Sequence, residues 1–462
     1  MLRERYEAEN IFERVQVVGL AMEPVLTNLD KVLDEDGVFQ GVKTDLGRRY
    51  PQTLRRGRWS TPVEVVLRML IVKHLYGWSY EQTEQWVNDS LVLRQFCRVY
   101  LEKVPDDTTL IRWANQIQPA TLDAVLEQVM RLATQLKVTK GRKLRVDSTV
   151  VETDVHHPVD STLLGDGVRV IHRLLDKARR VGRGQLGLKK KIVQQQGSAV
   201  RERVLQIMQA ARQRGETAAD QMRTAYQDLV QLSQQVVDQA LTVSQQLHQQ
   251  ATPTAQTLAH QLDTFVPRLQ QVIRQTTRRV LADQPVPASE KIVSLFEPHT
   301  AIIRKGKAGK PVEFGRVVWL DEVDGGLISR AQVLSGNPPD ADQLVPSLQH
   351  HQALFNHPPH LLAGDRKVFS PKGEAYALDR GVSYVVLPKP GAKSQARQTY
   401  ENQPWFRSGR NWRSGLEGRI SLLKRRFGLR RCRYHGDAGM QRCVSWGVIA
   451  YDLVTIARQL AR

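Results

Sequence analysis

The feature that most constrains the fold is a change of side-chain periodicity at Lys143 that is reversed further along the chain. Before this point apolar residues recur at three- and four-residue spacings, as in amphipathic helices. In residues 143–151 the side chains alternate between two faces, with Arg145, Asp147 and Thr149 on the polar one, as a strand requires. Helical spacing returns from about residue 165 to 290, and strand patterns resume after it. The sequence therefore predicts an α/β domain with a long helical insertion after its first strand.

Composition and charge limit the class of protein. The chain has 462 residues, 41% hydrophobic and 25% charged, which is typical of a globular protein with two or three domains. The sequence has no run of eighteen apolar residues, so no membrane span is predicted. It also has no apolar stretch near Met1, so no secretory signal is predicted. Three cysteines without a C-x-x-C pair indicate a reducing compartment and argue against structural zinc. A net charge of +20 predicts a polyanionic partner, most commonly nucleic acid.

Residues 1–140 have the pattern of short helices separated by turns. Two capping boxes are predicted, one from Thr61 to Glu64 with Pro62 at the first helical position, and one from Ser79 to Gln82. The spacing of the breaks favours a helix-turn-helix-like array that binds DNA. An ordinary helical bundle fits this segment equally well.

The insertion has an unusual composition. Residues 191–275 contain 21 glutamines and only two aromatic residues, Tyr226 and Phe265. Apolar residues nevertheless form a stripe with helical spacing, which predicts long helices packed as a hairpin or coiled pair. A glutamine-rich spacer of low complexity is the alternative. The stripe consists of Leu229, Leu232, Val236, Val237, Ala240, Leu241 and Leu247.

The C-terminal half alternates between strands and helices. Residues 312–320 and 326–334 read as a β-hairpin with its turn at Asp324-Gly325-Gly326. Laid end to end without the insertion, the elements follow the order of a ribonuclease-H-like α/β domain. The predicted helices are 340–355, 371–380, 411–427 and one from 439 onward, and the strands end at 365 and span 384–388. The predicted domains are 1–140, 141–164 with 291–435 as the catalytic core, 165–290 as the insertion, and a C-terminal helix in 436–462.

Three acidic residues fall where such a domain would hold a site. Asp147 lies on the polar face of the first strand, Asp365 at the carboxyl end of a predicted strand, and Glu417 on the helix after the last strand. Ligands of open α/β sheets gather at the carboxyl ends of strands. Three oxygen ligands from separate elements suit Mg²⁺, and two such ions can align an in-line displacement at phosphorus. Since one such acid alone is more often a cap or turn residue, the interpretation depends on all three.

The helix that carries Glu417 also carries cations. Arg413 and Lys424 share its face at 100° per residue, where they would keep the acid ionised and contact DNA phosphates. A plain ion-pair stripe is the alternative. Residues 389–433 hold thirteen Lys or Arg and two acids, interleaved with aromatic residues that suit base stacking. The predicted DNA-binding residues are Arg410, Trp412, Arg413, Lys424, Arg425 and Arg426.

Other polar residues carry less weight. Asp154, His156 and His157 follow the first strand, but no further His or Cys completes a closed metal set, so we interpret them as loop residues. Three further acids could replace a wrongly assigned ligand, although their positions on turns make this a minor alternative. These acids are Asp160, Asp321 and Glu322. No P-loop motif indicates ATP use.

With these residues in hand, the chain resembles bacterial insertion-sequence transposases of the DDE class, closest to the ISNCY-type group, over nearly its whole length. The resemblance rests on RVDSTVVETDVHHPVDS around Asp147, SEKIVSLFEPHTAIIRKGKAGKPVEFG at 289–315, GDRKVFSP around Asp365, and R-x3-E-x6-K from Arg413 to Lys424. The related signature usually has a tyrosine where this chain has Arg410, and a glycine where it has Lys367.

The resemblance implies a catalytic triad of Asp147, Asp365 and Glu417 on a ribonuclease-H-like core. It implies two Mg²⁺ ions, or Mn²⁺ in their place, with Asp147 bridging both. The implied reaction is hydrolysis at the ends of an element, followed by attack of the freed 3′-hydroxyl on target DNA. The implied partners are duplex DNA, as terminal inverted repeats and target, and a second copy of the chain in a homodimer. The implied location is the bacterial cytoplasm, at the nucleoid.

The helices within residues 79–117, together with Lys73 and Arg94, are our hypothesis for recognition of the terminal repeats. Two alternatives to a transposase stay open at this point. One is a structure-selective nuclease without strand transfer, and the other is a domesticated DNA-binding protein without catalysis.

Overall fold

The computed structural model describes residues 3–6, 22–33, 36–48, 59–182, 186–307 and 310–461. The chain divides into two compact units, one formed by residues 1–154 with 316–462 and the other by residues 155–315. The two units are defined by the contacts between their residues, and the predicted domain boundaries stay predictions. No helix in the described ranges has the length and apolar character that crossing a membrane needs.

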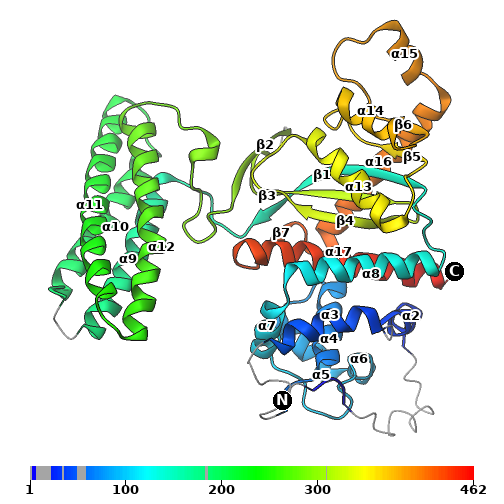
Figure 1. The fold of residues 1–462 in the computed structure, drawn as a ribbon. Coiled ribbons are helices and arrows are strands. Elements are labelled where there is room, and N and C mark those ends of the chain that lie inside the picture. The colour runs from blue at the N-terminus through cyan, green and yellow to red at the C-terminus, as the bar shows by residue number, and fades with distance from the viewer. Residues whose placement is uncertain are drawn as a thin grey trace. The chain divides into compact units, whose positions relative to one another are not determined.

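The first unit contains a layer of helices and a sheet (Figure 1). The long helix α17 (Gly436–Leu460) is buried along most of its length and packs against α8, α2, α4 and strand β4. Among the described residues, seven further helices form the N-terminal helical part of the unit. These helices are α2 (Pro24–Leu33), α3 (Asp36–Gly47), α4 (Val63–Tyr76), α5 (Tyr80–Asp89), α6 (Leu91–Phe96), α7 (Asp107–Gln116) and α8 (Pro119–Gln135).

The two predicted capping boxes have different outcomes. The Ser79 box is confirmed, because its hydroxyl accepts from the Gln82 amide while the Gln82 side chain accepts from the Ser79 amide. The Thr61 box is wrong. Helix α4 has Pro62 as its N-cap, so Thr61 lies one residue too early to reach the first-turn amides, and no side chain caps this end.

The sheet of the first unit is built around strand β1 (Lys143–Thr153). In the first unit the hydrogen-bonded strands run in the order β3, β1, β5, β6, and β4 pairs with β3 off this path. Strands β3 (Lys310–Val323) and β4 (Leu327–Val333) form the predicted antiparallel hairpin, which is confirmed, with Gly325 and Gly326 at positive φ in its turn. Strand β5 (Leu361–Ala363) is parallel to β1, as β6 (Tyr384–Val386) is to β5, and the short β7 (Arg431–Cys432) pairs with the far end of β1.

Four α-helices connect or follow these strands. They are α13 (Leu344–Phe355), α14 (Pro371–Asp379), α15 (Gln395–Glu401) and α16 (Pro404–Arg426), with a short 3₁₀ turn η4 (Asp340–Gln343) before the first. Helix α16 packs against β1, β5 and β6, and it begins seven residues before the predicted start at 411. The earlier start is explained by Pro404, because proline in the first turn favours the beginning of a helix.

The second unit is a bundle of four helices with a few short elements. Its helices share one hydrophobic core that includes Leu229, Val236 and Leu262, so the low-complexity spacer is wrong for this segment. The prediction of a helical hairpin or coiled pair named too few helices, because α9 and α10 pack on the same core as α11 and α12. The helices are α9 (Asp160–Val181), α10 (Lys190–Ala210), α11 (Glu216–His248) and α12 (Pro253–Thr276). The short elements are η2 (Thr277–Leu281), η3 (Ala288–Glu290) and β2 (Ala301–Lys307), which pairs with the start of β3.

Candidate active site

Two of the predicted catalytic acids lie on neighbouring parallel strands. The register pairs Arg145 of β1 with Ala363 of β5, so Asp147 and Asp365 each follow a paired position by two residues. The Asp147 side chain is largely buried, at 16% exposure. The Asp365 carboxylate accepts hydrogen bonds from the Lys367 and Val368 amides at 2.8 and 3.2 Å, which hold the turn after β5. Asp147 and Asp365 therefore occupy equivalent positions along the parallel strands β1 and β5, two residues beyond the same paired register.

The third acid, Glu417, reaches this place through an arginine. On α16 Arg413 lies one turn before Glu417, and its Nη2 donates to the Glu417 carboxylate at 2.5 Å. The other guanidinium nitrogen, Nη1, contacts the Asp147 carboxylate at 3.5 Å. Arg413 thus joins β1 to α16 at the predicted site. The Glu417 side chain itself is 64% exposed.

The acids do not form a closed metal site by themselves. In the ranges that the structure describes, no three His, Cys, Asp or Glu side chains gather in a group that could hold a metal ion. Arg413 accounts for part of this, because its guanidinium occupies oxygens that a cation between Asp147 and Glu417 would need. The donor chemistry still fits a hard divalent ion, since all three predicted ligands are carboxylates. The metal set stays a prediction.

A buried ion pair that sequence reasoning missed lies directly behind the acids. Arg145 of β1 donates to the carboxylate of Glu322 on β3, with Nε to Oε2 at 2.9 Å, and both residues are buried. Arg145 also donates to the Trp412 carbonyl on α16, and its guanidinium lies 4.6 Å from the Trp412 ring centroid. Gly415 permits this approach, since a Cβ there would lie 2.7 Å from Arg145. The arginine therefore ties β3 and α16 to β1 two residues before Asp147.

This network includes two residues named from the sequence. Glu322 is a structural partner of Arg145 and, at 3.6 Å, of Arg419, and burial raises its pKa. The ring of Trp412 contacts Arg145 and lies 5.7 Å from the Lys143 ammonium, while its expected stacking on DNA bases stays a prediction. A signal for this network was present, because Arg145 shares the polar face of its strand with Asp147.

The predicted DNA-binding cations of α16 differ in how they are used. Arg410, Arg425 and Arg426 are exposed and form no ion pair with another described residue, so they are available to a polyanion. Lys424 is partly buried and already interacts within the protein, so it differs from these three exposed arginines. Arg413 is paired with the two acids.

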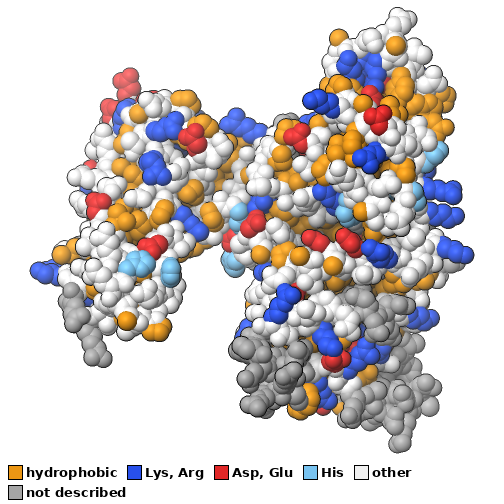
Figure 2. All heavy atoms as spheres, in the orientation of Figure 1, with side chains coloured by type: hydrophobic (Ala, Val, Ile, Leu, Met, Phe, Trp, Pro, Cys, Tyr) orange, Lys and Arg blue, Asp and Glu red, His pale blue; other side chains and the backbone are white. Residues whose placement is uncertain are grey.

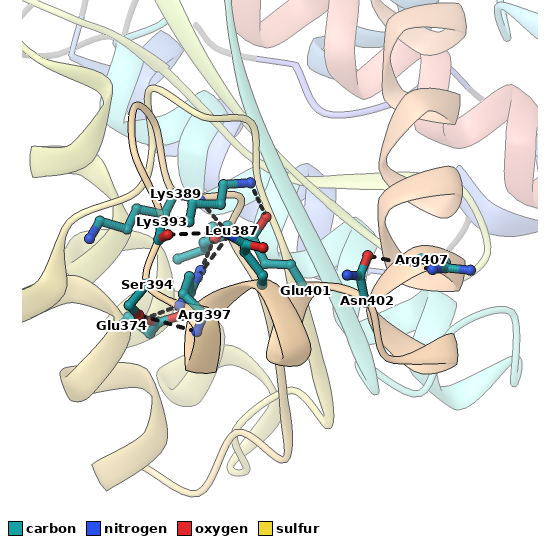
Figure 3. Close-up of polar contacts among 10 residues, drawn as sticks. Glu374, Leu387, Lys389, Lys393, Ser394, Arg397, Glu401, Asn402 and Arg407 are labelled. Atoms are coloured by element: carbon teal, nitrogen blue, oxygen red, sulfur yellow. Dashed lines mark hydrogen bonds and ion pairs between the residues drawn. The ribbon is translucent and has the colours of Figure 1, made fainter.

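Part of the basic segment 389–433 serves the fold instead. Figure 3 shows Arg397 between two acids, with Nη1 donating to Glu374 at 2.7 and 2.8 Å and Nε donating to Glu401 at 2.8 Å. The Lys393 ammonium donates to the Glu401 carboxylate at 2.5 Å, and the Lys389 backbone amide donates to the same carboxylate at 2.9 Å. Burial raises the pKa of Glu401, but the hydrogen bonds from Lys393 and Arg397 outweigh it and lower that pKa. These cations form ion pairs that stabilise the connection between β6 and α16, so they do not contribute to a free basic surface.

Both cations named in the hypothesis for terminal-repeat recognition, Lys73 and Arg94, have partners inside the protein, and the hypothesis stays a prediction. Lys73 is buried, its ammonium lies 4.6 Å from the Tyr80 ring centroid, and burial lowers its pKa to about 8. Arg94 donates to the carbonyls of Tyr100 and Glu102 at 2.7 and 2.6 Å. Helix α4 is buried on almost all sides, so its cations point into the protein rather than toward a ligand.

The remaining candidates have structural partners as well. Asp321 accepts from Trp319 and from Ser347, both at 2.7 Å, in the core of the first unit. Asp160 pairs with Arg279 at 2.6 Å in the second unit. His156 lies in the loop after β1, and its Nε2 is 2.8 Å from the Asp166 carboxylate.

Comparison with known families places one part of the chain. The model of a family described as a transposase domain (DUF772) matches residues 20–116. This match supports a transposase and covers the N-terminal helices, while the ISNCY-type group stays a prediction. No curated protein and no solved structure matches the chain.

Proposed function

We propose that this chain is a DDE-type DNA transposase that binds the ends of an insertion sequence and catalyses metal-dependent cleavage and strand transfer. The observation that carries the proposal is the parallel register of β1 and β5, which sets Asp147 and Asp365 at equivalent positions, with Arg413 linking Asp147 to Glu417. The transposase-domain match at residues 20–116 supports the same class from an independent part of the chain.

We further propose that the first unit has a ribonuclease-H-like core. The strand order β3, β1, β5, β6 supports it, with β5 and β6 parallel to β1 and the hairpin of β3 and β4 on the other side. The bundle of residues 155–315 would then be an insertion between β1 and the hairpin.

Asp147, Asp365 and Glu417 are the residues that would hold divalent metal, Mg²⁺ or Mn²⁺, and the metal would supply activation of water and charge stabilisation at phosphorus. Arg413 would neutralise the acids before DNA arrives and bind a phosphate oxygen afterwards. Arg410, Arg425 and Arg426 would position the DNA backbone. In the first reaction a water oxygen bonds to phosphorus and the 3′-oxygen leaves with a proton. In the second, the oxygen of that 3′-hydroxyl bonds to a target phosphorus as it loses its proton, and the target 3′-oxygen leaves with a proton.

A non-catalytic DNA-binding protein is the second candidate. It is favoured by the placement of Arg413 between Asp147 and Glu417, which leaves no closed metal group among the described residues. An arginine that permanently satisfied both acids would make them structural.

The deciding experiment uses the full chain, Mg²⁺ or Mn²⁺, and labelled duplexes that carry the DNA flanking its own gene. We expect cleavage and joined products from the wild type, and a loss of at least about 10³-fold in Asp147→Asn and Asp365→Asn with DNA binding retained. Asp154→Asn is the matched control, because this exposed acid follows the same strand but pairs with Arg431 at 3.6 Å. Cleavage without joined product indicates a nuclease, and equal turnover by Asp365→Asn removes that acid from the site.

A further inference from the structure

The surplus positive charge of the chain is concentrated in two segments. Residues 389–433 hold thirteen Lys or Arg against two acids, and residues 169–191 hold nine against one. Together they account for +19 of the net +20, so the rest of the chain is almost neutral. The first segment belongs to the proposed catalytic unit. The second lies in the helical bundle, for which the proposed reaction assigns no role.

The basic segment of the bundle borders an open groove. The groove lies between α9 and α10 and has a volume of about 790 Å³. Five cations line it, and Figure 2 shows Lys and Arg side chains beside hydrophobic ones on this bundle. They are Arg169, Arg173 and Arg180 from α9 and Lys190 and Arg201 from α10.

Acids of the bundle neutralise only some of these cations. Arg169 pairs with Asp166 and Arg180 pairs with Asp176, each at 2.6 Å. Arg173, Lys190 and Arg201 are exposed, and none of them forms an ion pair with a described residue. Arg201 donates a hydrogen bond to the Gly197 carbonyl at 3.2 Å, but no acid among the described residues offsets the charge of these three cations, and their mutual repulsion costs free energy. A ligand with negative charge would remove that cost.

The arrangement of the cations favours an extended ligand. At 100° per residue Arg169, Arg173 and Arg180 lie within about 40° of one another on α9, over an axial length of about 16 Å. Lys190 and Arg201 span a similar length on the facing helix, α10. A small anion would need cations converging on one point, whereas a nucleic acid strand presents a charge at each phosphate along its length.

We propose that the groove between α9 and α10 is a second binding surface for the phosphate backbone of duplex DNA. Its contacts are ionic, so it binds DNA with little dependence on sequence. This surface rests on the proposed function only in that the chain handles DNA. The groove would give the chain a DNA-binding surface whose residues are different from the acids of the first unit.

The test is a charge reversal in the groove of the full chain, Arg173→Glu/Lys190→Glu/Arg201→Glu. The matched control reverses three exposed cations of the same bundle that do not line the groove, Arg212→Glu/Arg214→Glu/Arg274→Glu. The affinity for a random-sequence duplex is measured by fluorescence anisotropy from 0.05 to 0.3 M salt. Circular dichroism checks that both variants keep their helices. Each lost phosphate contact lowers the salt slope by about 0.9, so we expect about tenfold or greater loss at 0.1 M salt and a slope smaller by about 2 to 3.

Equal losses in the groove variant and the control would overturn the proposal, because they would reflect net charge alone. Loss of binding to acidic phospholipid vesicles or to RNA, with duplex affinity unchanged, would also overturn it. The proposed catalysis is scored separately through Asp147→Asn and end cleavage. If that variant still cleaves, the transposase proposal fails while the groove result stands; if the groove variant binds like the wild type while Asp147→Asn is inactive, only the groove fails.

Discussion

The two units of this chain bury different kinds of side chain. The first buries several ionisable groups, among them Arg145, Asp321, Glu322 and Asp452. The hydrophobic core of the helical bundle consists of Leu, Ile, Val and Ala with one tyrosine, and the buried Asp160 at the start of α9 pairs with Arg279. A buried charge needs a particular partner at a particular place, whereas an apolar core tolerates exchange of side chains of similar volume. The first unit therefore gives up stability to hold defined geometry around Asp147, and the apolar core of the bundle gains stability with fewer such demands.

The largest effect that tests this contrast is removal of one partner of the buried ion pair. Arg145→Met leaves Glu322 buried with only the more distant Arg419, and we expect a loss of about 3–5 kcal/mol in the free energy of unfolding. The double variant Arg145→Met/Glu322→Met should regain most of it, since no charge is then left unpaired. Hydrogen exchange of the β1 and β3 amides measures the loss in the unit concerned.

The same pair of variants separates geometry from stability. The double variant still lacks the bond from Arg145 to the Trp412 carbonyl that anchors α16, so its DNA cleavage should stay low although its stability recovers. Recovery of both together would mean that Arg145 stabilises the unit without positioning Glu417. A double variant as unstable as Arg145→Met would contradict our account of the buried charge.

In the bundle the corresponding change is a cavity. Leu229 is fully buried on α11, and Leu229→Ala should cost about 2–5 kcal/mol, with faster hydrogen exchange in α9 to α12. Leu241→Ala is the control on the same helix, because Leu241 is 41% exposed and its truncation should cost less than about 0.5 kcal/mol. Similar costs at both sites would show that the bundle core is not packed as described.

The buried acids of the first unit should also make its stability depend on pH. Burial raises the pKa of Asp321 to about 6, against about 3.9 for an unfolded chain. The folded protein then holds this proton more tightly, so the contribution is complete below about pH 4 and is lost as the pH rises through 6. We expect wild-type stability to fall by about 2–3 kcal/mol over this window relative to Asp321→Asn.

Urea unfolding at several pH values, followed through the tryptophan fluorescence of the first unit, measures this difference. Asp154→Asn, which changes an exposed acid, should keep the wild-type profile. An Asp321→Asn profile parallel to that of the wild type would contradict the assigned protonation.

These contrasts also mark what could be read from the sequence. The hairpin of β3 and β4 follows from alternation around Gly325 and Gly326, and the Ser79 cap from four adjacent residues, because both are encoded within a short window. The pairing of Arg145 with Glu322 joins residues 177 apart, so no local pattern reveals it. The burial of Lys73 was missed for a related reason, since a cation on an almost wholly buried helix looks like a surface residue until its neighbours are known.

The candidate site shows the same division. Asp147 and Asp365 could be placed at strand positions from alternation and order, and their strands do pair in register. The arginine that connects Asp147 to Glu417 was expected to share a helical face with Glu417, but its contact with β1 depends on how α16 packs on the sheet. Packing of this kind is set by shape over many residues, which periodicity does not record.

The smallest predicted effect compares one helix cap in each unit. Ser79 accepts from the Gln82 amide at 3.0 Å as part of a reciprocal box, whereas Thr252 at the start of α12 accepts from the Ala255 amide at 3.3 Å without one. Ser79→Ala should therefore cost about 1 kcal/mol and Thr252→Ala somewhat less, each measured by hydrogen exchange in its own helix. Thr61→Ala, which caps nothing, is the control and should cost less than either. A loss at Thr61 equal to that at Ser79 would mean that α4 begins one residue earlier than described, and a larger loss at Thr252 would show that the bundle depends on local capping more than on its apolar core.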